Sequence, residues 1–360
     1  MNLHPLLKQL ESYIGGCISQ PSIQMQHLSG AGNTYLLEQK LCNHYSKKYA
    51  VAYCNATTAL MALCGALQLK RDKIISTPFN WGGSISPFLF CNNKVCFSSV
   101  EDTTLNIAAY NLSGSLSNKT KVILSTDFNG TPADSKAIKG FCKQHGLFYI
   151  SDSAQSLGAY RYDKPAGFYA DAIVLSFSPG KSFFAGEGGA ILTDDAELYE
   201  KLIWYSQHPA RQKKIFGLSE YNEYAPINGR CNPLSAIMLS ELFEPYLTDL
   251  KNYQANCFTA INKLREQSMI TLPEQLQKPE NSTFFNLIFQ ISGEATFSDI
   301  TSFINSSALP LLVEEIKPRY IPFDRAFKKQ FSKQYNVSPD LIIQKKSMDK
   351  TDWIKLTFKT

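Results

Sequence analysis

The stretch from residue 122 to residue 151 decides the fold class. It reads Val122-Ile123-Leu124-Ser125, then the helix-like segment Ser135–His145, and then Phe148-Tyr149-Ile150-Ser151. Apolar residues recur at helical spacing in the middle segment, at Ile138, Phe141 and Cys142. The first run is continuously apolar, as expected for a strand covered on both faces. Strand, helix and strand in this order predict a parallel βαβ unit within an α/β domain.

The same alternation continues in both directions along the chain. Further runs rich in β-branched and aromatic residues are Ala50–Tyr53, Lys73–Ser76, Val95–Ser99, Ile173–Ser178 and Ala190–Thr193. The segment Thr57–Leu69 is typical of a helix between two of them. The sequence therefore predicts an α/β fold with a mostly parallel sheet flanked by helices.

The pattern changes after about residue 233. A long helical stretch runs from Leu234 toward Leu264, and strand-like and helix-like segments then follow at Phe285–Ile291, Ser298–Ser306, Leu311–Glu314 and Trp353–Phe358. We expect a large domain at residues 1–245, including the N-terminal segment, and a smaller C-terminal α+β domain at residues 246–360.

Composition excludes several classes of protein. The 360 residues are 44% hydrophobic, and the net charge of +5 has no concentrated basic tract, which argues against nucleic-acid and membrane partners. Nine cysteines without a CxxC pair indicate reduced thiols, and no spacing typical of a metal site occurs. The start of the chain lacks the features of a signal peptide, and no apolar stretch is long enough to span a bilayer. We predict a soluble, cytoplasmic protein.

Two polar elements follow the first predicted strands. Cys54-Asn55-Ala56-Thr57-Thr58 opens a helix, where free N–H groups and small side chains favour an anion such as phosphate; ordinary capping by Asn55 or Thr57 is the alternative. Trp81, in Phe79-Asn80-Trp81-Gly82-Gly83, offers a flat face to a planar ring, or else is a core residue.

Two more elements follow later strands. Asp152 ends a predicted buried strand, where open α/β sheets bind ligands, although it is also suited to capping the next turn. Lys181 follows Ser176-Phe177-Ser178-Pro179-Gly180 and precedes Gly186-Glu187-Gly188-Gly189; by itself it is most simply a surface lysine. Its amine is the group that forms an imine with an aldehyde cofactor. In chain order, the four elements match the phosphate, ring face, ring nitrogen and aldehyde of one ligand, pyridoxal 5'-phosphate (PLP).

With these residues in view, the sequence resembles the DegT/DnrJ/StrS family of sugar aminotransferases, which are fold-type I PLP enzymes. The resemblance covers roughly residues 27 to 243. It rests on Phe128-Asn129-Gly130-Thr131-Pro132-Ala133-Asp134, on Asp152-Ser153-Ala154-Gln155, and most specifically on Ser176–Lys181 followed by Glu187-Gly188-Gly189.

The resemblance implies a role for each matching residue. Lys181 corresponds to the Schiff-base lysine, Asp152 to the partner of the pyridine nitrogen, Gln155 to a contact on the ring-oxygen side, and Trp81 to the stacking aromatic. The phosphate contacts correspond to Ala56, Thr57 and Ser176. Asn228, in Asn228-Gly229-Arg230, corresponds to an asparagine that reaches the phosphate across a dimer interface, which implies a homodimer with shared active sites.

The activity implied by the resemblance is transfer of an amino group from an amino acid, glutamate in the family, to a nucleotide-linked keto-sugar. Ser178 stands where His or an aromatic residue is common, and His208-Pro209 where His-Gly is usual; the chain after about residue 245 matches poorly. Three alternatives stay open: a cyclitol or other ketone as acceptor, another PLP reaction such as dehydration, and a non-catalytic sensor of PLP or of a nucleotide-sugar. Related dehydratases carry His in place of the lysine, so Lys181 argues against dehydration.

Overall fold

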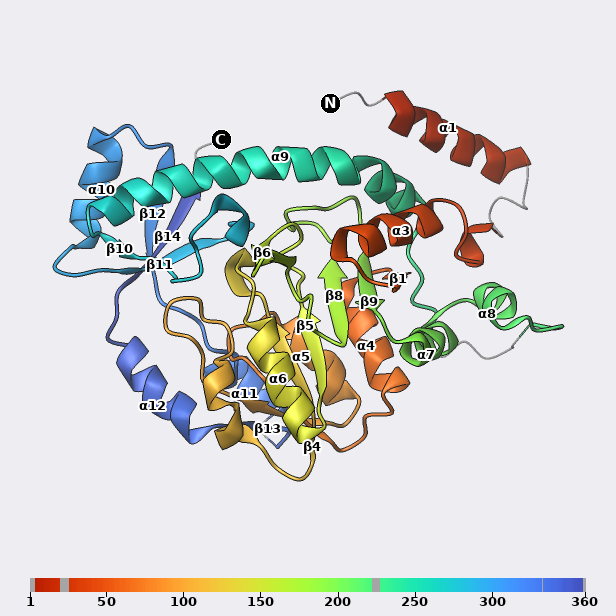
Figure 1. Cartoon of the computed structure of the whole chain (residues 1–360), viewed down its shortest axis with the longest axis horizontal. Helices are drawn as coiled ribbons and strands as arrows, with labels where there is room; N and C mark the ends of the chain where they lie inside the picture. Colours follow the sequence, from red (N-terminus) through yellow and green to blue (C-terminus); the bar gives the residue numbers. More distant parts are fainter. Residues whose placement is uncertain (1–3, 20–25, 222–226, 332, 359–360) are drawn as a thin grey trace. The chain divides into compact units, whose positions relative to one another are not determined.

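A computed structural model describes residues 4–19, 26–221, 227–331 and 333–358. Figure 1 shows its helices and strands, coloured from red at the N-terminus to blue at the C-terminus. The chain divides into two compact units. Unit 1 consists of residues 1–71, 83–93 and 170–248, and unit 2 consists of residues 72–82, 94–169 and 249–360.

Unit 1 contains three strands of the α/β fold, β1 (Tyr49–Tyr53), β8 (Ala172–Ser176) and β9 (Gly189–Thr193). All three were predicted from their apolar runs, but β9 pairs antiparallel with both β1 and β8. The prediction of a mostly parallel sheet did not specify the direction of individual strands, and here β9 runs antiparallel to both neighbours. The reason is the connection between β8 and β9, which is the loop 177–188 rather than a crossover helix, so the chain returns in the opposite direction.

Helices α3, α4 and α7 pack on these strands. The helices that lie mainly in unit 1 are α1 (His4–Ser19), α3 (Asn33–Tyr45), α4 (Ala56–Ala66), α5 (Gly82–Phe90), α7 (Ala196–Ser206) and α8 (Pro209–Phe216). A buried ion pair links α3 to α8, with both Arg211 terminal nitrogens 2.9 Å from the Glu38 carboxylate oxygens. Arg211 is thus occupied in holding unit 1 together.

Unit 2 contains a parallel sheet in the order β5-β4-β2-β3-β13. Its strands are β2 (Lys73–Ser76), β3 (Lys94–Phe97), β4 (Thr120–Thr126), β5 (Phe148–Asp152) and β13 (Tyr335–Val337). Helix α6 (Ser135–His145) connects β4 to β5, packs on β5 and begins at the Asp134 cap, whose carboxylate accepts from the Ala137 N–H at 2.9 Å. The predicted βαβ unit is confirmed.

A second, antiparallel sheet in unit 2 has the order β10-β11-β14-β12, with strands β10 (Ile270–Thr271), β11 (Leu287–Ile291), β12 (Leu311–Ile316) and β14 (Trp353–Phe358). Helix α10 (Phe297–Ser306) packs on β12 (Figure 1). Its buried Ile300 and Ile304 join a core with Ile261 and Leu264 from the end of α9 (Pro233–Glu266). The predicted strands and helices of the C-terminal region are therefore present.

The remaining elements of unit 2 are short: the hairpin β6 (Tyr160–Arg161) and β7 (Lys164–Pro165), helices α11 (Arg325–Phe331) and α12 (Pro339–Met348), and 3-10 turns at Ala109–Ser115, Phe128–Gly130, Pro279–Asn281 and Ile321–Phe323. Strand β13 was not predicted. It lies between β12 and β14 in the sequence, yet it pairs with β3 at the edge of the parallel sheet. The C-terminal segment thus contributes to both sheets of unit 2.

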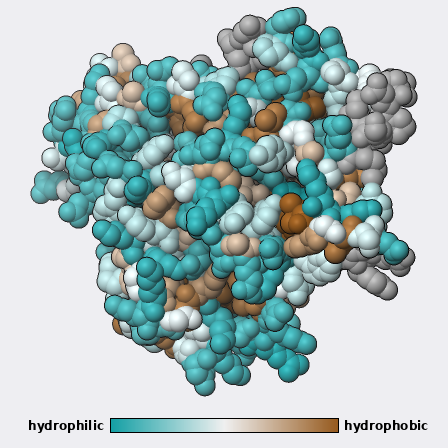
Figure 2. All heavy atoms as spheres, turned by 45° about the vertical axis from the view of Figure 1, so that its right-hand side comes forward, coloured by the Kyte–Doolittle hydropathy of each residue, from teal (hydrophilic) through white to brown (hydrophobic). Residues whose placement is uncertain are grey.

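Among the described residues, no helix is both long enough and apolar enough to cross a membrane. On the face drawn in Figure 2, hydrophilic side chains predominate, and hydrophobic ones form small patches between them.

Candidate cofactor site

At the start of α4 in unit 1, the first backbone N–H groups have no acceptor within the helix. Asn55 caps the helix, and its side-chain oxygen accepts from the Thr58 N–H at 2.8 Å, so the capping role considered for this residue is confirmed. Ala56 and Thr57 occupy the first turn, where the helix itself supplies no acceptor for their N–H groups. A helix start of this kind attracts an anion through its N–H donors and the helix dipole.

Strands β8 and β9 bring two further residues to the same place. Ser176, the last residue of β8, pairs with Gly189, the first residue of β9. A Cβ atom on Gly189 would lie only 2.6 Å from the Ala56 nitrogen, so this position has to be glycine for the start of α4 to pack against β9. The Ser176 hydroxyl and the first N–H groups of α4 therefore belong to one region of unit 1, and as donors they fit a phosphate group.

Lys181 lies on the loop between β8 and β9, just after a turn in which its N–H bonds to the Ser178 carbonyl at 3.2 Å. Phe183 anchors the loop, since it is buried and stacks on Tyr246 with ring centroids 4.6 Å apart. A second anchor is Glu187, whose N–H donates to the Ser235 hydroxyl of α9 at 3.3 Å and whose carboxylate accepts from the Ser178 hydroxyl at 2.6 Å. The partly exposed Lys181 thus lies on a loop whose course is fixed by the contacts of Phe183 and Glu187.

The Ser178–Glu187 contact also explains one departure from the family pattern. A serine at residue 178 bonds across the loop to the glutamate of the Glu-Gly-Gly segment, so Ser178 helps to fix the loop that carries Lys181.

Asn228 lies beside the end of β1 in unit 1. Its neighbour Gly229 accepts from the Cys54 N–H at 2.9 Å, and Arg230 forms an isolated bridge with Tyr53. Asn228 itself is exposed, has a left-handed backbone (φ 51°) and accepts a hydrogen bond from the Arg230 guanidinium. The segment is therefore anchored next to the start of α4, with the Asn228 side chain at the surface.

In unit 2, Asp152 and Gln155 lie at the carboxyl ends of the parallel strands. Asp152 is the last residue of β5 and is 2% exposed, with one carboxylate oxygen accepting from the Ala154 N–H at 3.2 Å. The Gln155 side-chain oxygen accepts from the Asn129 N–H at 2.9 Å, which orients its amide. A buried carboxylate at this edge is suited to holding a proton on a ring nitrogen.

Trp81 borders a cavity of about 530 Å³ within unit 2. The Trp81 side chain is 73% exposed, which excludes the alternative of a core tryptophan. The cavity wall is aromatic at Phe79, Phe128 and Phe327, and its charged side chains are Lys317 and the Arg319–Asp324 ion pair. A ring stacked on Trp81 would therefore lie beside a space with an aromatic wall.

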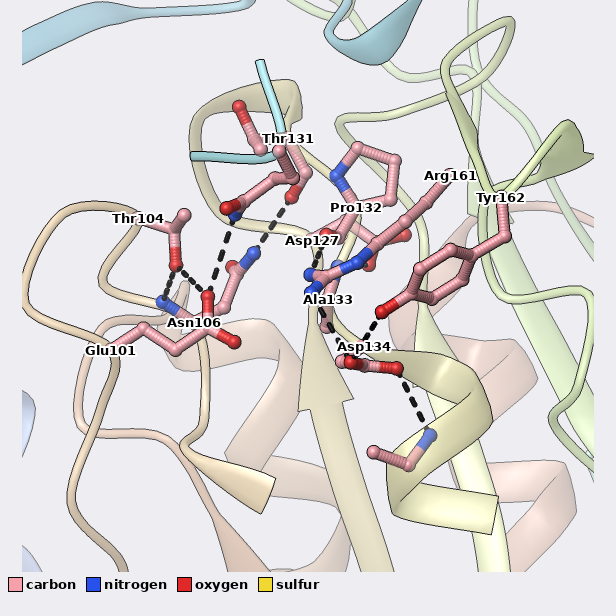
Figure 3. Close-up of polar contacts among 12 residues, drawn as sticks. Glu101, Thr104, Asn106, Asp127, Thr131, Pro132, Ala133, Asp134, Arg161 and Tyr162 are labelled. Carbon is pink, nitrogen blue, oxygen red and sulfur yellow. Dashed lines mark hydrogen bonds and ion pairs between the residues drawn. The ribbon is translucent and has the colours of Figure 1, made fainter. Parts of the chain in front are cut away.

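Sequence reasoning missed Asp127, the first residue after β4. It is completely buried, and burial raises the pKa of its carboxyl to about 6, against the lowering effect of hydrogen bonds from Ser153 and Ser156. Figure 3 shows the loop that begins at Asp127: this residue accepts from the Ala133 N–H at 2.8 Å. The signal was available, since Asp127 closely follows the predicted strand of β4 and directly precedes the stretch used for the resemblance.

The predicted residues are divided between the two units. Unit 1 holds the start of α4, Ser176, the Lys181 loop and Asn228, and unit 2 holds Trp81, Asp152 and Gln155.

The sequence matches the DegT/DnrJ/EryC1/StrS aminotransferase family over residues 22–341. The chain belongs to this family. Two proteins with sequences similar to this chain are as follows. The UDP-4-amino-4,6-dideoxy-N-acetyl-beta-L-altrosamine transaminase of Helicobacter pylori is 29% identical over 67% of this chain and 65% of the relative. GDP-perosamine synthase of Vibrio cholerae is 23% identical over 69% of this chain and 65% of the relative. The DegT/DnrJ/EryC1/StrS chain described here thus spans 65% of the length of each of these proteins.

The fold of this family member is also found among solved structures. A mutant of GDP-4-keto-6-deoxymannose-3-dehydratase with bound GDP-perosamine superimposes with a TM-score of 0.75 at 20% identity, covering 91% of this chain and 88% of that chain. The predicted fold class, fold-type I of the PLP-dependent enzymes, is confirmed.

Proposed function

We propose that the chain is a PLP-dependent aminotransferase that moves an amino group from glutamate to a nucleotide-linked keto-sugar. The observation that carries the proposal is Lys181, held on an anchored loop directly after β8 in a member of an aminotransferase family. The names of the two relatives, a UDP-sugar transaminase and a GDP-perosamine synthase, favour a nucleotide-linked sugar as acceptor.

Each predicted residue would then have a defined task. The N–H groups of Ala56 and Thr57 and the Ser176 hydroxyl bind the phosphate of PLP, and Trp81 covers one face of its ring. The Asp152 carboxylate holds a proton on the ring nitrogen. With its oxygen bound to Asn129, Gln155 directs its amide N–H donors to the ring hydroxyl oxygen.

Lys181 carries the chemistry contributed by the chain. Bound PLP supplies an aldehyde that takes an amine covalently and a protonated ring that accepts an electron pair. The Lys181 amine would hold the cofactor and, when free, would be the base that takes the proton from the donor α-carbon. The same amine would supply a proton at C4′, and amination of the acceptor would use the same residue in a second half-reaction, with ping-pong kinetics.

We further infer a homodimer in the cytoplasm. Asn228 is exposed and its segment is anchored at the surface of unit 1, which suits a contact with the phosphate bound by a second copy of the chain. A dimer with two shared sites follows from that contact.

The test combines spectroscopy with product analysis. Purified protein is titrated with PLP, and it is then incubated with glutamate and with UDP- or GDP-linked 4-keto-6-deoxy sugars. We expect a new absorbance band, formation of 2-oxoglutarate and a product whose mass is that of the aminated sugar. A deoxy product with release of ammonia would instead show dehydration. If a cyclitol ketone is aminated and the sugars are not, the acceptor is a cyclitol and not a nucleotide-linked sugar. No absorbance change on adding PLP would contradict the proposal altogether.

Gly189→Ala tests the phosphate half of the site. The added methyl group meets backbone atoms at 2.6 Å, so we expect the start of α4 to shift, with the free energy of unfolding falling by about 1 to 3 kcal/mol. The Kd for PLP should rise by about tenfold, which corresponds to about 1.4 kcal/mol of lost binding. Absorbance titration and thermal unfolding measure the two effects.

The matched control for this variant is Gly140→Ala. Residue 140 lies in α6, and a methyl group there meets no atom within 4 Å. This control should keep the Kd of the unchanged protein and gain about 0.5 to 1 kcal/mol of stability. Equal PLP affinity in both variants would show that Gly189 is not needed for binding of the phosphate.

A further inference from the structure

Asp127 is a buried acid for which the proposed chemistry gives no task. Its carboxyl accepts three hydrogen bonds, from the Ser153 hydroxyl at 2.6 Å, the Ser156 hydroxyl at 2.7 Å and the Ala133 N–H at 2.8 Å. Two hydroxyl donors and one amide donor need several acceptor lone pairs in one place, and a carboxylate offers about four. The environment therefore suits a carboxylate better than any neutral side chain.

These contacts hold both ends of the segment 152–156. The Asp127 N–H donates to the Asp152 carbonyl at 3.0 Å, which continues the β4–β5 pairing by one residue. The carboxylate also accepts hydrogen bonds from the hydroxyls of Ser153, which follows Asp152, and of Ser156, which follows Gln155. Two of the predicted cofactor contacts of unit 2, Asp152 and Gln155, thus lie next to a residue bound by Asp127.

The same loop also orients the Gln155 side chain. Asn129, two residues after Asp127, adopts a left-handed backbone (φ 57°) and donates its N–H to the Gln155 side-chain oxygen at 2.9 Å. Thr283 holds the backbone of the same segment, because its hydroxyl donates to the Gln155 carbonyl at 2.6 Å. All of these groups are buried, so water offers no easy substitute for a lost contact.

We infer that Asp127 is a positioning residue, which fixes Asp152 and Gln155 at the carboxyl end of the sheet in the orientation that the cofactor ring requires. This inference rests on the proposed function. It assigns Asp127 an indirect role, through Ser153 and Ser156, and no contact with the reacting atoms.

The first test is Asp127→Asn, compared with Asp134→Asn. Misplacement of catalytic groups by about 1 Å costs about 100-fold, so we expect kcat of the Asp127 variant to fall about 10- to 100-fold with the KM values nearly unchanged. The visible circular dichroism of bound PLP should weaken, because the ring is no longer held in one orientation. Asp134, on the same loop, caps α6 and pairs with Arg161 (Figure 3), and its variant should keep the kcat and the dichroism of the unchanged protein.

The second test asks whether Asp127 acts through the serines. Ser156→Ala removes one donor and should lower kcat about 3- to 10-fold, the range of one lost hydrogen bond. Combined with Asp127→Asn, it should lower kcat no further, because residues of one network are not additive. If Asp127→Asn does not fold, the Ser156→Ala result alone decides.

The outcomes separate this inference from the proposed function. Wild-type protein that shows no absorbance change with PLP contradicts the function. Wild-type protein that binds PLP and turns over, with Asp127→Asn equal to it in kcat and dichroism but lower in thermal stability, makes Asp127 a purely structural residue and overturns the inference. A multiplicative effect of the two substitutions would overturn the route through Ser156.

Discussion

Lys181→Ala is expected to abolish covalent attachment of PLP and to lower kcat by at least about 10⁴-fold. The amine has two tasks in the proposed mechanism, holding the cofactor and moving a proton, and general acid–base catalysis by itself contributes about 10² to 10⁴-fold. An alanine side chain performs neither task. The fold should be preserved, since the loop is anchored by Phe183 and by the Ser178–Glu187 contact rather than by the lysine.

Absorbance spectra after PLP addition and steady-state rates with glutamate measure the effect of this change. Lys201→Ala is the matched control, because Lys201 is a lysine of unit 1 that pairs with Glu197 on the surface of α7. The control should retain both the absorbance band and the rate. Persistence of the band together with normal turnover in Lys181→Ala would show that another amine carries the cofactor.

Asp152→Asn is expected to cause the second-largest loss. An opposite charge close to an ionisable group typically moves its pKa by about 1 to 3 units. Without the carboxylate, the ring nitrogen would be protonated in about 10- to 1000-fold fewer molecules at neutral pH, and kcat should fall by a similar factor. PLP affinity should change much less, since the proposed phosphate contacts are residues of unit 1.

The control for Asp152→Asn is Asp163→Asn, which alters an exposed aspartate of unit 2 that pairs with Lys278. Rates and PLP titrations on both variants distinguish loss of catalysis from loss of binding. A rate for Asp152→Asn within about twofold of the wild-type value would remove Asp152 from the catalytic machinery.

The buried elements of the fold were predictable because burial on both faces leaves a direct mark in the sequence. Helix α6 was predicted with its observed bounds because its apolar residues repeat at helical spacing, and the continuously apolar Val122–Ser125 marked the centre of β4. Strand direction leaves no such mark, which is why the antiparallel course of β9 was missed. Strand β13 was missed because it is only three residues long and carries no buried apolar run.

The site was predictable only where a residue's position in the chain reveals its place in the fold. Asp152 ends an apolar strand and Lys181 lies on the loop that follows another, so sequence order indicated where each would lie. The two serine partners of Asp127 are 26 and 29 residues further along, and they meet it because Thr126 is in register with Asp152. The anchoring of the Lys181 loop by Tyr246 depends likewise on packing that no local pattern reveals.

The course of the C-terminal segment has a consequence for how unit 2 unfolds. After β12 the chain leaves the antiparallel sheet, adds β13 to the edge of the parallel sheet, and returns with β14 between β11 and β12. In the sequence, β13 of the parallel sheet thus lies between β12 and β14 of the antiparallel sheet. Neither sheet is therefore formed by one continuous segment of the chain. Limited proteolysis is therefore expected to release no stable C-terminal fragment, and hydrogen exchange should show the two sheets of unit 2 opening as one cooperative block. A chimera that exchanges the C-terminal region with that of a relative has to bring a strand that fits the edge of β3.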